Sequence, residues 1–257
     1  MTGYYIKRIQ DVFHLPNDTG MQWLTMLYPA LEESYVFDES LSPEQKFSIL
    51  LQSYIGLFEF NSGQRTSLEK MVSRINIFLK DIDTKTGGIK KGYLLNWEKG
   101  IIKERHTGGY YIRPLTGYHI RALTHSLGLS DKEAARLLKA AFPGLEKSYF
   151  DTYTTPLPIK ELLESCIARL EFMEAKEISF DAVAKSIGTT PTAFKRWKTG
   201  EETINLEKFA EGIKATFRLE DAYEDFEYIV QKFSPNPIVH DASYRNTTQK
   251  EPNNRQT

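Results

Sequence analysis

The segment from residue 178 to residue 200 constrains the fold of this chain more than any other part of the sequence. Val183 and Ile187 are four residues apart and therefore lie on the same face of a short helix. Gly188 follows directly, at a place where a tight turn often needs a positive φ. Pro191 then suits the first position of a second helix. The segment is therefore predicted to form two short helices joined by a tight turn.

The side chains of the two predicted helices divide into an inner and an outer set. Ala184 is small enough to let the helices approach closely, and Phe194 and Trp197 give the second helix its buried face. Ser179 and Thr190 are the predicted N-caps. The residues left on the outside of the second helix are Thr192, Ala193, Lys195, Arg196 and Thr199. Such a pair is the sequence form of a helix-turn-helix, which places its second helix in the major groove of DNA.

This pattern resembles the Cro/repressor-type helix-turn-helix family over about residues 161–219. The matching residues are Ala184, Gly188, Phe194 and Trp197, followed by Lys198-Thr199-Gly200. The resemblance implies a five-helix domain that binds double-stranded DNA, usually as a homodimer. The family often has a polar residue where this chain has Phe180, which we expect in the core instead.

The resemblance also implies which residues contact DNA. Thr192 and Arg196 would face base edges, because arginine can bond guanine in bidentate fashion and threonine can meet a thymine methyl group. The implied contacts to phosphates or flanking bases are Thr190, Lys195, Lys198 and Thr199.

Residues 119–160 are interpreted as a degenerate second copy of the motif. Residues 127–138 parallel residues 177–187, with a serine, an alanine and a terminal aliphatic residue at matching distances. The second helix of this copy would run from residue 145 to 153, where Glu146 and Asp151 would repel phosphate. We therefore expect packing or a flanking contact from it. A chance resemblance between two capped helices is the alternative.

The whole chain is predicted to be mainly α-helical. Apolar residues recur every three or four positions in 47–58 and 68–79, and Ser42 with Gln45 is a predicted capped helix start. Another helix, interrupted by Pro29, is expected near 21–33, with Trp23, Leu24, Leu27 and Leu31 on one face. The predicted regions are a helical oligomerisation or partner-binding region at 1–83, a small β-rich insert at 84–117, a degenerate helix-turn-helix at 118–160, a helix-turn-helix DNA-binding domain at 161–233 and a disordered tail at 234–257.

The predicted insert at 84–117 is a small β-hairpin or meander. Glycines separate short β-prone runs at 93–95, 101–102 and 110–112. The segment also has a local excess of cations, and the candidates for phosphate contact are Lys90, Lys91, Lys103 and Arg105. The alternative is a solvated edge whose charges discourage strand pairing.

Composition excludes several classes of protein. With 40% hydrophobic and 12% aromatic residues, the chain can fill a core and is not expected to be globally disordered. Its net charge of −1 requires that any DNA contact come from a local patch. The single cysteine, Cys166, has apolar neighbours at helical spacing, so we expect a buried thiol. No run is long enough to span a bilayer and no signal-peptide core is present, so we expect a cytoplasmic protein that does not engage the membrane.

We expect neither enzyme chemistry nor a metal or cofactor. The six-residue spacing of His119 and His125 does not align them on one helix face, and no metalloprotease or nucleophile-elbow motif occurs. The predicted function is sequence-specific DNA binding in transcription control. Two alternatives stay open: a DNA-binding protein of plasmid or phage partition or replication control, and an interaction adaptor with a repurposed helix-turn-helix.

Overall fold

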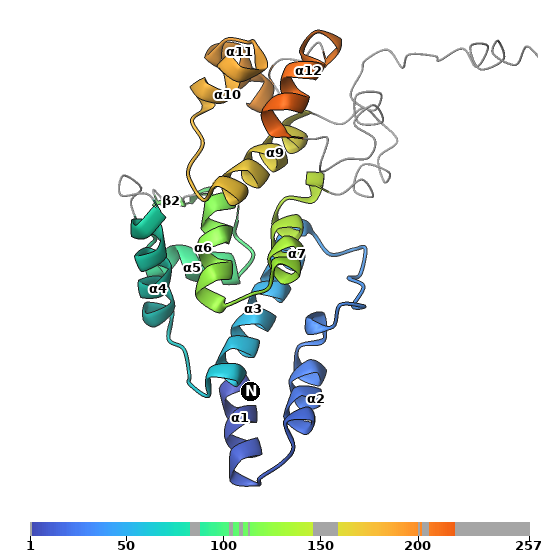
Figure 1. The fold of residues 1–257 in the computed structure, drawn as a ribbon, viewed down its shortest axis with the longest axis vertical. Helices are drawn as coiled ribbons and strands as arrows, with labels where there is room; N and C mark the ends of the chain where they lie inside the picture. Colours follow the sequence, from blue (N-terminus) through green and yellow to red (C-terminus); the bar gives the residue numbers. More distant parts are fainter. Residues whose placement is uncertain are drawn as a thin grey trace, which may run out of the picture.

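The computed structural model describes residues 2–82, 88–102, 105–107, 110–112, 114–145, 159–199, 201 and 206–218, and of its two strands it describes the backbone alone. Within these ranges the chain is mainly α-helical, which confirms the mainly α part of the predicted fold class. Helices α1 and α2 lie at one end of the long axis, and α10, α11 and α12 lie at the other (Figure 1). No described helix is both long and apolar enough to cross a bilayer.

The N-terminal part is a group of helices built around α3. Its elements are α1 (Gly3–Val12), α2 (Asn17–Leu27), the short 3-10 helix η1 (Pro29–Leu31), α3 (Pro43–Ser62) and α4 (Leu68–Ile82). The predicted capping box starts α3, where Ser42 Oγ accepts the Gln45 N–H at 3.3 Å and Gln45 Oε1 accepts the Ser42 N–H at 2.8 Å. Helix α1 packs so closely on α3 that a Cβ on Gly3 would lie 1.7 Å from the Gly56 carbonyl oxygen.

The helix expected near residues 21–33 is interrupted next to Pro29, as predicted, but its predicted buried face is wrong. It is divided at Tyr28 into α2 and η1, and Leu24 is fully buried. Trp23 and Leu27 are 38% and 41% exposed. These two side chains reach solvent because α2 lies at the end of the molecule, where it has neighbouring helices on one side (Figure 1).

The middle of the chain forms α5 (Lys91–Glu98), β1 (Arg105–Thr107), β2 (Tyr110–Ile112), α6 (Gly117–Leu127), α7 (Asp131–Ala141) and the 3-10 helix η2 (Pro143–Leu145). The strands pair antiparallel, with His106 opposite Tyr111. The β-rich insert predicted at 84–117 is not supported as a whole. The β-prone run at 93–95 is wrong, because Leu94 and Trp97 are buried at the three-residue spacing of a helix.

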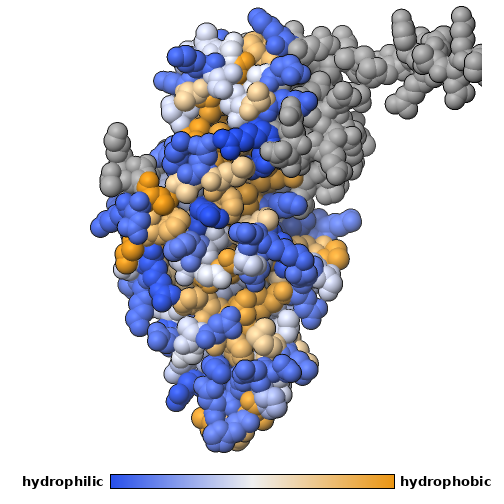
Figure 2. All heavy atoms as spheres, viewed as in Figure 1, coloured by the Kyte–Doolittle hydropathy of each residue, from blue (hydrophilic) through white to orange (hydrophobic). Residues whose placement is uncertain are grey.

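Two larger hydrophobic cores lie one after the other along the chain. The N-terminal core draws buried residues from 30 to 141, including Tyr54, Trp97 and Tyr118, so the 84–117 segment shares the core of its neighbours. The C-terminal core draws buried residues from 162 to 217. We call the described part from residue 2 to 145 the N-terminal body and the described part from residue 159 to 218 the C-terminal unit. On the face shown in Figure 2, apolar residues gather along the middle and hydrophilic residues cover much of both ends.

The C-terminal unit comprises α9 (Ile159–Glu174), α10 (Phe180–Ile187), α11 (Pro191–Thr199) and α12 (Leu206–Phe217). Helix α9 runs beneath the other three and packs against α6 of the N-terminal body (Figure 1). It thereby joins the tip of the molecule to the rest of the chain.

Candidate nucleic-acid interface

The two helices and the tight turn predicted between residues 178 and 200 are present. Helix α10 ends at Ile187, and Gly188 adopts a φ of +88° before α11 begins at Pro191. A Cβ at Gly188 would meet no atom within 4 Å, so the turn requires glycine for its backbone conformation rather than for space. Thr190 Oγ accepts the Ala193 N–H at 3.2 Å and caps α11, as predicted.

The predicted inner residues form the core beneath these helices. Val183, Ala184, Ile187, Phe194 and Trp197 are all buried. They pack on α9 and on α12.

Two further contacts fix α12 in place behind α10 and α9. A Cβ on Gly212 would lie 2.3 Å from the Ile187 carbonyl oxygen, so α12 rests directly on the end of α10. The Arg169 guanidinium on α9 donates to the carbonyls of Phe217 and Arg218 at 2.9 and 3.2 Å and caps α12. The helix pair therefore stands on a fixed support.

The residues predicted to contact DNA lie on the outer face of this pair. Thr190, Thr192, Lys195, Arg196 and Thr199 are exposed, and Lys198 is half-buried. Helix α11 carries three cations and no carboxylate. Lys185 on α10 is also exposed, and sequence reasoning did not single it out.

Two expectations at the start of α10 are wrong. Phe180 is 44% exposed rather than part of the core. Helical spacing places it on the same face as Val183 and Ile187, but the first turn of α10 projects beyond the core. The centre of the Phe180 ring lies 6.4 Å from the centre of the Phe194 ring. Ser179 occupies the N-cap position with an extended backbone, yet its side chain makes no capping bond.

Of the four cations proposed for phosphate contact in the 84–117 segment, the structure describes the side chains of Lys90 and Lys91. Lys90 is exposed at the start of α5, and the Lys91 ammonium is paired with the Glu69 carboxylate. Hydrogen bonding to Lys91 holds the pKa of Glu69 below its usual range. Lys103 lies outside the described residues, and of Arg105 the backbone is described in β1.

The second copy of the motif stays a prediction, and the structure describes two helices in its first part. Helices α6 and α7 are joined through Gly128, with a φ of +64°, and Ser130 starts α7 with a full capping box. Its expected second helix, residues 145–153, falls almost wholly on residues outside the described ranges, as does the tail at 234–257. Helices α6 and α7 both contribute buried residues to the N-terminal core.

Comparison with known proteins adds no relative. A scan against protein-family models, a search of curated proteins and a search of solved structures each found no match. The geometry and chemistry of the chain itself therefore carry the functional argument.

A buried acid that the sequence analysis missed lies beneath this interface. Glu171 on α9 is 5% exposed and accepts backbone N–H groups from Gly117 and Ile178. The helical register could have revealed it, because Glu171 is four residues after Ile167 and therefore lies on the buried stripe of α9.

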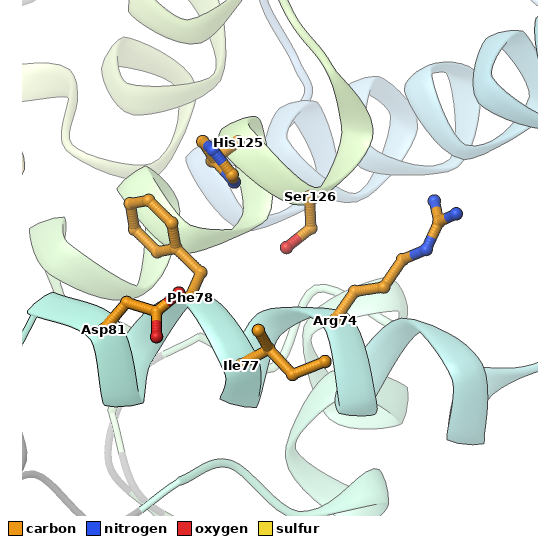
Figure 3. Close-up of a pocket in the computed structure, with 6 residues that line it drawn as sticks. All are labelled: Arg74, Ile77, Phe78, Asp81, His125 and Ser126. Carbon is orange, nitrogen blue, oxygen red and sulfur yellow. The ribbon is translucent and has the colours of Figure 1, made fainter.

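Two other features are separate from the exposed face of α11. A shallow pocket of about 250 Å³ opens between α4 and α6, where the ring of Phe78 stacks on that of His125 at 4.2 Å and Arg74 and Asp81 stand on either side (Figure 3). Among the described residues, no group of three or more His, Cys, Asp or Glu side chains could hold a metal ion. Cys166 is buried as predicted, and burial raises the pKa of its thiol to about 12.

Proposed function

We propose that this chain is a sequence-specific DNA-binding protein of transcription control and that it places α11 in the major groove of double-stranded DNA. In this arrangement Thr192 and Arg196 face base edges. The other residues of the interface, Thr190, Lys195, Lys198 and Thr199, contact phosphates or flanking bases.

The observation that carries the proposal is the division of α11 into two chemically distinct faces. Phe194 and Trp197 are 0% and 3% exposed on the inner side. Lys195 and Arg196 project on the other side, and no carboxylate lies on this helix to oppose a phosphate. Since the chain has a net charge of −1, binding of a polyanion needs a local concentration of positive charge such as this one.

The support beneath α11 also favours recognition of a defined sequence. Reading base edges requires that a helix hold its side chains in one orientation. The Thr199 hydroxyl donates to the carbonyl oxygens of Lys195 and Arg196 at 3.2 and 3.1 Å, which satisfies acceptors in the last turn of α11. The Thr216 hydroxyl donates to the Ser186 hydroxyl at 2.9 Å and joins α12 to α10.

A homodimer and a cytoplasmic location are parts of the same proposal. One helix of nine residues reads only a few base pairs, so two copies on adjacent half-sites give a useful specificity. We assign self-association to the N-terminal region, because several of its large apolar residues are exposed, including Phe13 at 69% and Met26 at 79%.

Selection of bound duplexes from a random DNA pool, at a stated salt concentration, tests the proposal. We expect a short enriched site and an affinity that falls steeply as salt rises. Binding to iterated sites near a replication origin would favour the partition or replication alternative. The absence of binding to any duplex would overturn the proposal and leave the adaptor alternative.

A further inference from the structure

The carboxyl group of Glu171 joins the N-terminal body to the C-terminal unit. Its Oε2 atom accepts the N–H of Gly117, the first residue of α6, at 3.0 Å. Its Oε1 atom accepts the N–H of Ile178, which leads into α10, at 3.4 Å. Helix α6 contributes to the N-terminal core and α10 to the C-terminal core. The Glu171 side chain therefore hydrogen-bonds to the backbone of both parts.

The junction around Glu171 is tightly packed. A Cβ on Gly117 would lie 1.6 Å from the Ala168 carbonyl oxygen, so the start of α6 rests directly on the α9 backbone. One turn further along, the Arg121 guanidinium of α6 lies 5.3 Å from the centre of the Phe172 ring. The Glu171 carboxyl can therefore regain its full hydration only when α6, α9 and the segment before α10 separate.

The charged and titratable groups near Glu171 come from each neighbouring element. Glu177 lies in the segment before α10 and Lys198 lies on α11. On the α6 side, Arg121 lies over the ring of Phe172, the residue that follows Glu171. Burial is the largest influence and raises the pKa of Glu171 to about 7. Glu177 adds to the rise, and the two backbone N–H groups and Lys198 oppose it.

We propose that Glu171 is a positioning residue whose charge state sets how firmly the C-terminal unit is docked on the N-terminal body. A buried carboxylate is penalised relative to a hydrated one, so the ionised form favours the open junction and the neutral form favours the closed one. Docking is then firmest below neutral pH. It weakens as the pH rises from the pKa of a hydrated glutamate to about 7 and levels off above that, because the docked state holds the proton over this range and the open state does not.

A consequence for DNA affinity follows and rests on the proposed function. Phosphates bound near Lys198 disfavour a negative charge at Glu171, so DNA binding and protonation support each other. We therefore expect affinity for DNA to rise as the pH falls from 8 to 6.5. The docking effect itself requires no DNA and can be measured without it.

Hydrogen exchange of the Gly117 and Ile178 amides in the full-length chain tests the docking effect. Relative to intrinsic rates, we expect the protection of both amides to fall about fivefold between pH 6 and pH 7 and to change little above pH 8. In Glu171→Gln, which cannot ionise, this fall should disappear. Glu174→Gln is the matched control on the same helix, and its amide protection should fall with pH as in the wild type. The protection of the Leu50 amide in the N-terminal core should show whether the whole protein opens instead.

Two results would overturn this proposal. One is wild-type protection of Gly117 and Ile178 that does not change between pH 6 and pH 7, and the other is an unchanged fall in Glu171→Gln. If that variant does not fold, the carboxyl ¹³C shift of Glu171 in the wild-type chain decides, since a midpoint near 7 supports the proposal and one near that of a hydrated glutamate contradicts it. Protection that titrates in a chain that binds no DNA would leave the docking effect standing while the proposed function failed.

Discussion

The ammonium group of Lys198 lies 4.1 Å from the centre of the Phe180 ring, across the space between α11 and α10. A cation over an aromatic face is stabilised by the charge distribution of the ring. The exposed ring of Phe180 thus positions Lys198, one of the proposed phosphate-binding residues.

Replacing Phe180 tests this relationship. Phe180→Ala should weaken binding to a selected duplex by roughly two- to fivefold, the scale of an exposed cation–π contact, and should change stability little. Phe180→Tyr keeps an aromatic face and should retain affinity. Fluorescence anisotropy with a labelled duplex measures both variants, and equal affinity in Phe180→Ala would show that the ring has no positioning role.

The turn at Gly188 gives a prediction of stability. Gly188→Ala should lower the free energy of unfolding by about 1–2 kcal/mol, because a side chain is strained at a φ of +88° although the space is open. Gly92→Ala is the matched control, since Gly92 lies within α5 with equally open space. This variant should instead raise the free energy of unfolding by roughly 0.5–1 kcal/mol. Urea unfolding measures both changes, and a neutral Gly188→Ala would contradict the strained turn.

The Cys166 thiol should be inert in the native protein. Burial raises its pKa to about 12, so hardly any thiolate is present at pH 8, and the side chain is 1% exposed. A thiol reagent followed by absorbance should therefore react only as fast as the C-terminal unit opens. Denaturant should restore the ordinary rate, and rapid labelling of the folded protein would contradict the packing of α9.

Sequence patterns predicted most of the C-terminal unit because each signal there is local. The positive φ of Gly188, the Thr190 cap and the buried face of Phe194 and Trp197 are set within a few residues. The strand predicted near Tyr93 is wrong because its structure depends on distant contacts. Leu94 and Trp97 pack in the N-terminal core, and this tertiary packing overrides the local β preference.

The parts of the site that sequence reasoning missed depend on distant neighbours. Nothing near Phe180 in the sequence shows that the first turn of α10 extends past the core. The partners of Glu171 are backbone groups, and one of them, Gly117, is 54 residues away. Such contacts leave no local pattern beyond an acid on an otherwise buried helix stripe.

Self-association through the N-terminal region can be tested by charge. Phe13→Asp places a carboxylate in the exposed apolar surface near the end of α1 and should shift a dimer to monomers in sedimentation velocity. Lys46→Asp, on α3, is a control that should leave the mass unchanged. A wild-type chain that sediments as a monomer at micromolar concentration would remove the dimer from the proposal.

Base readout by α11 is tested most directly by removing the two side chains assigned to it. The double variant Thr192→Ala with Arg196→Ala should lose roughly 30-fold or more in affinity for the selected duplex, since each of the two base contacts contributes about 1–3 kcal/mol. Lys80→Ala, an exposed lysine in the last turn of α4, is the control and should bind as the wild type does. Loss of binding with an unchanged circular dichroism spectrum is the predicted result, and unaltered affinity in the double variant would contradict recognition of DNA by this helix.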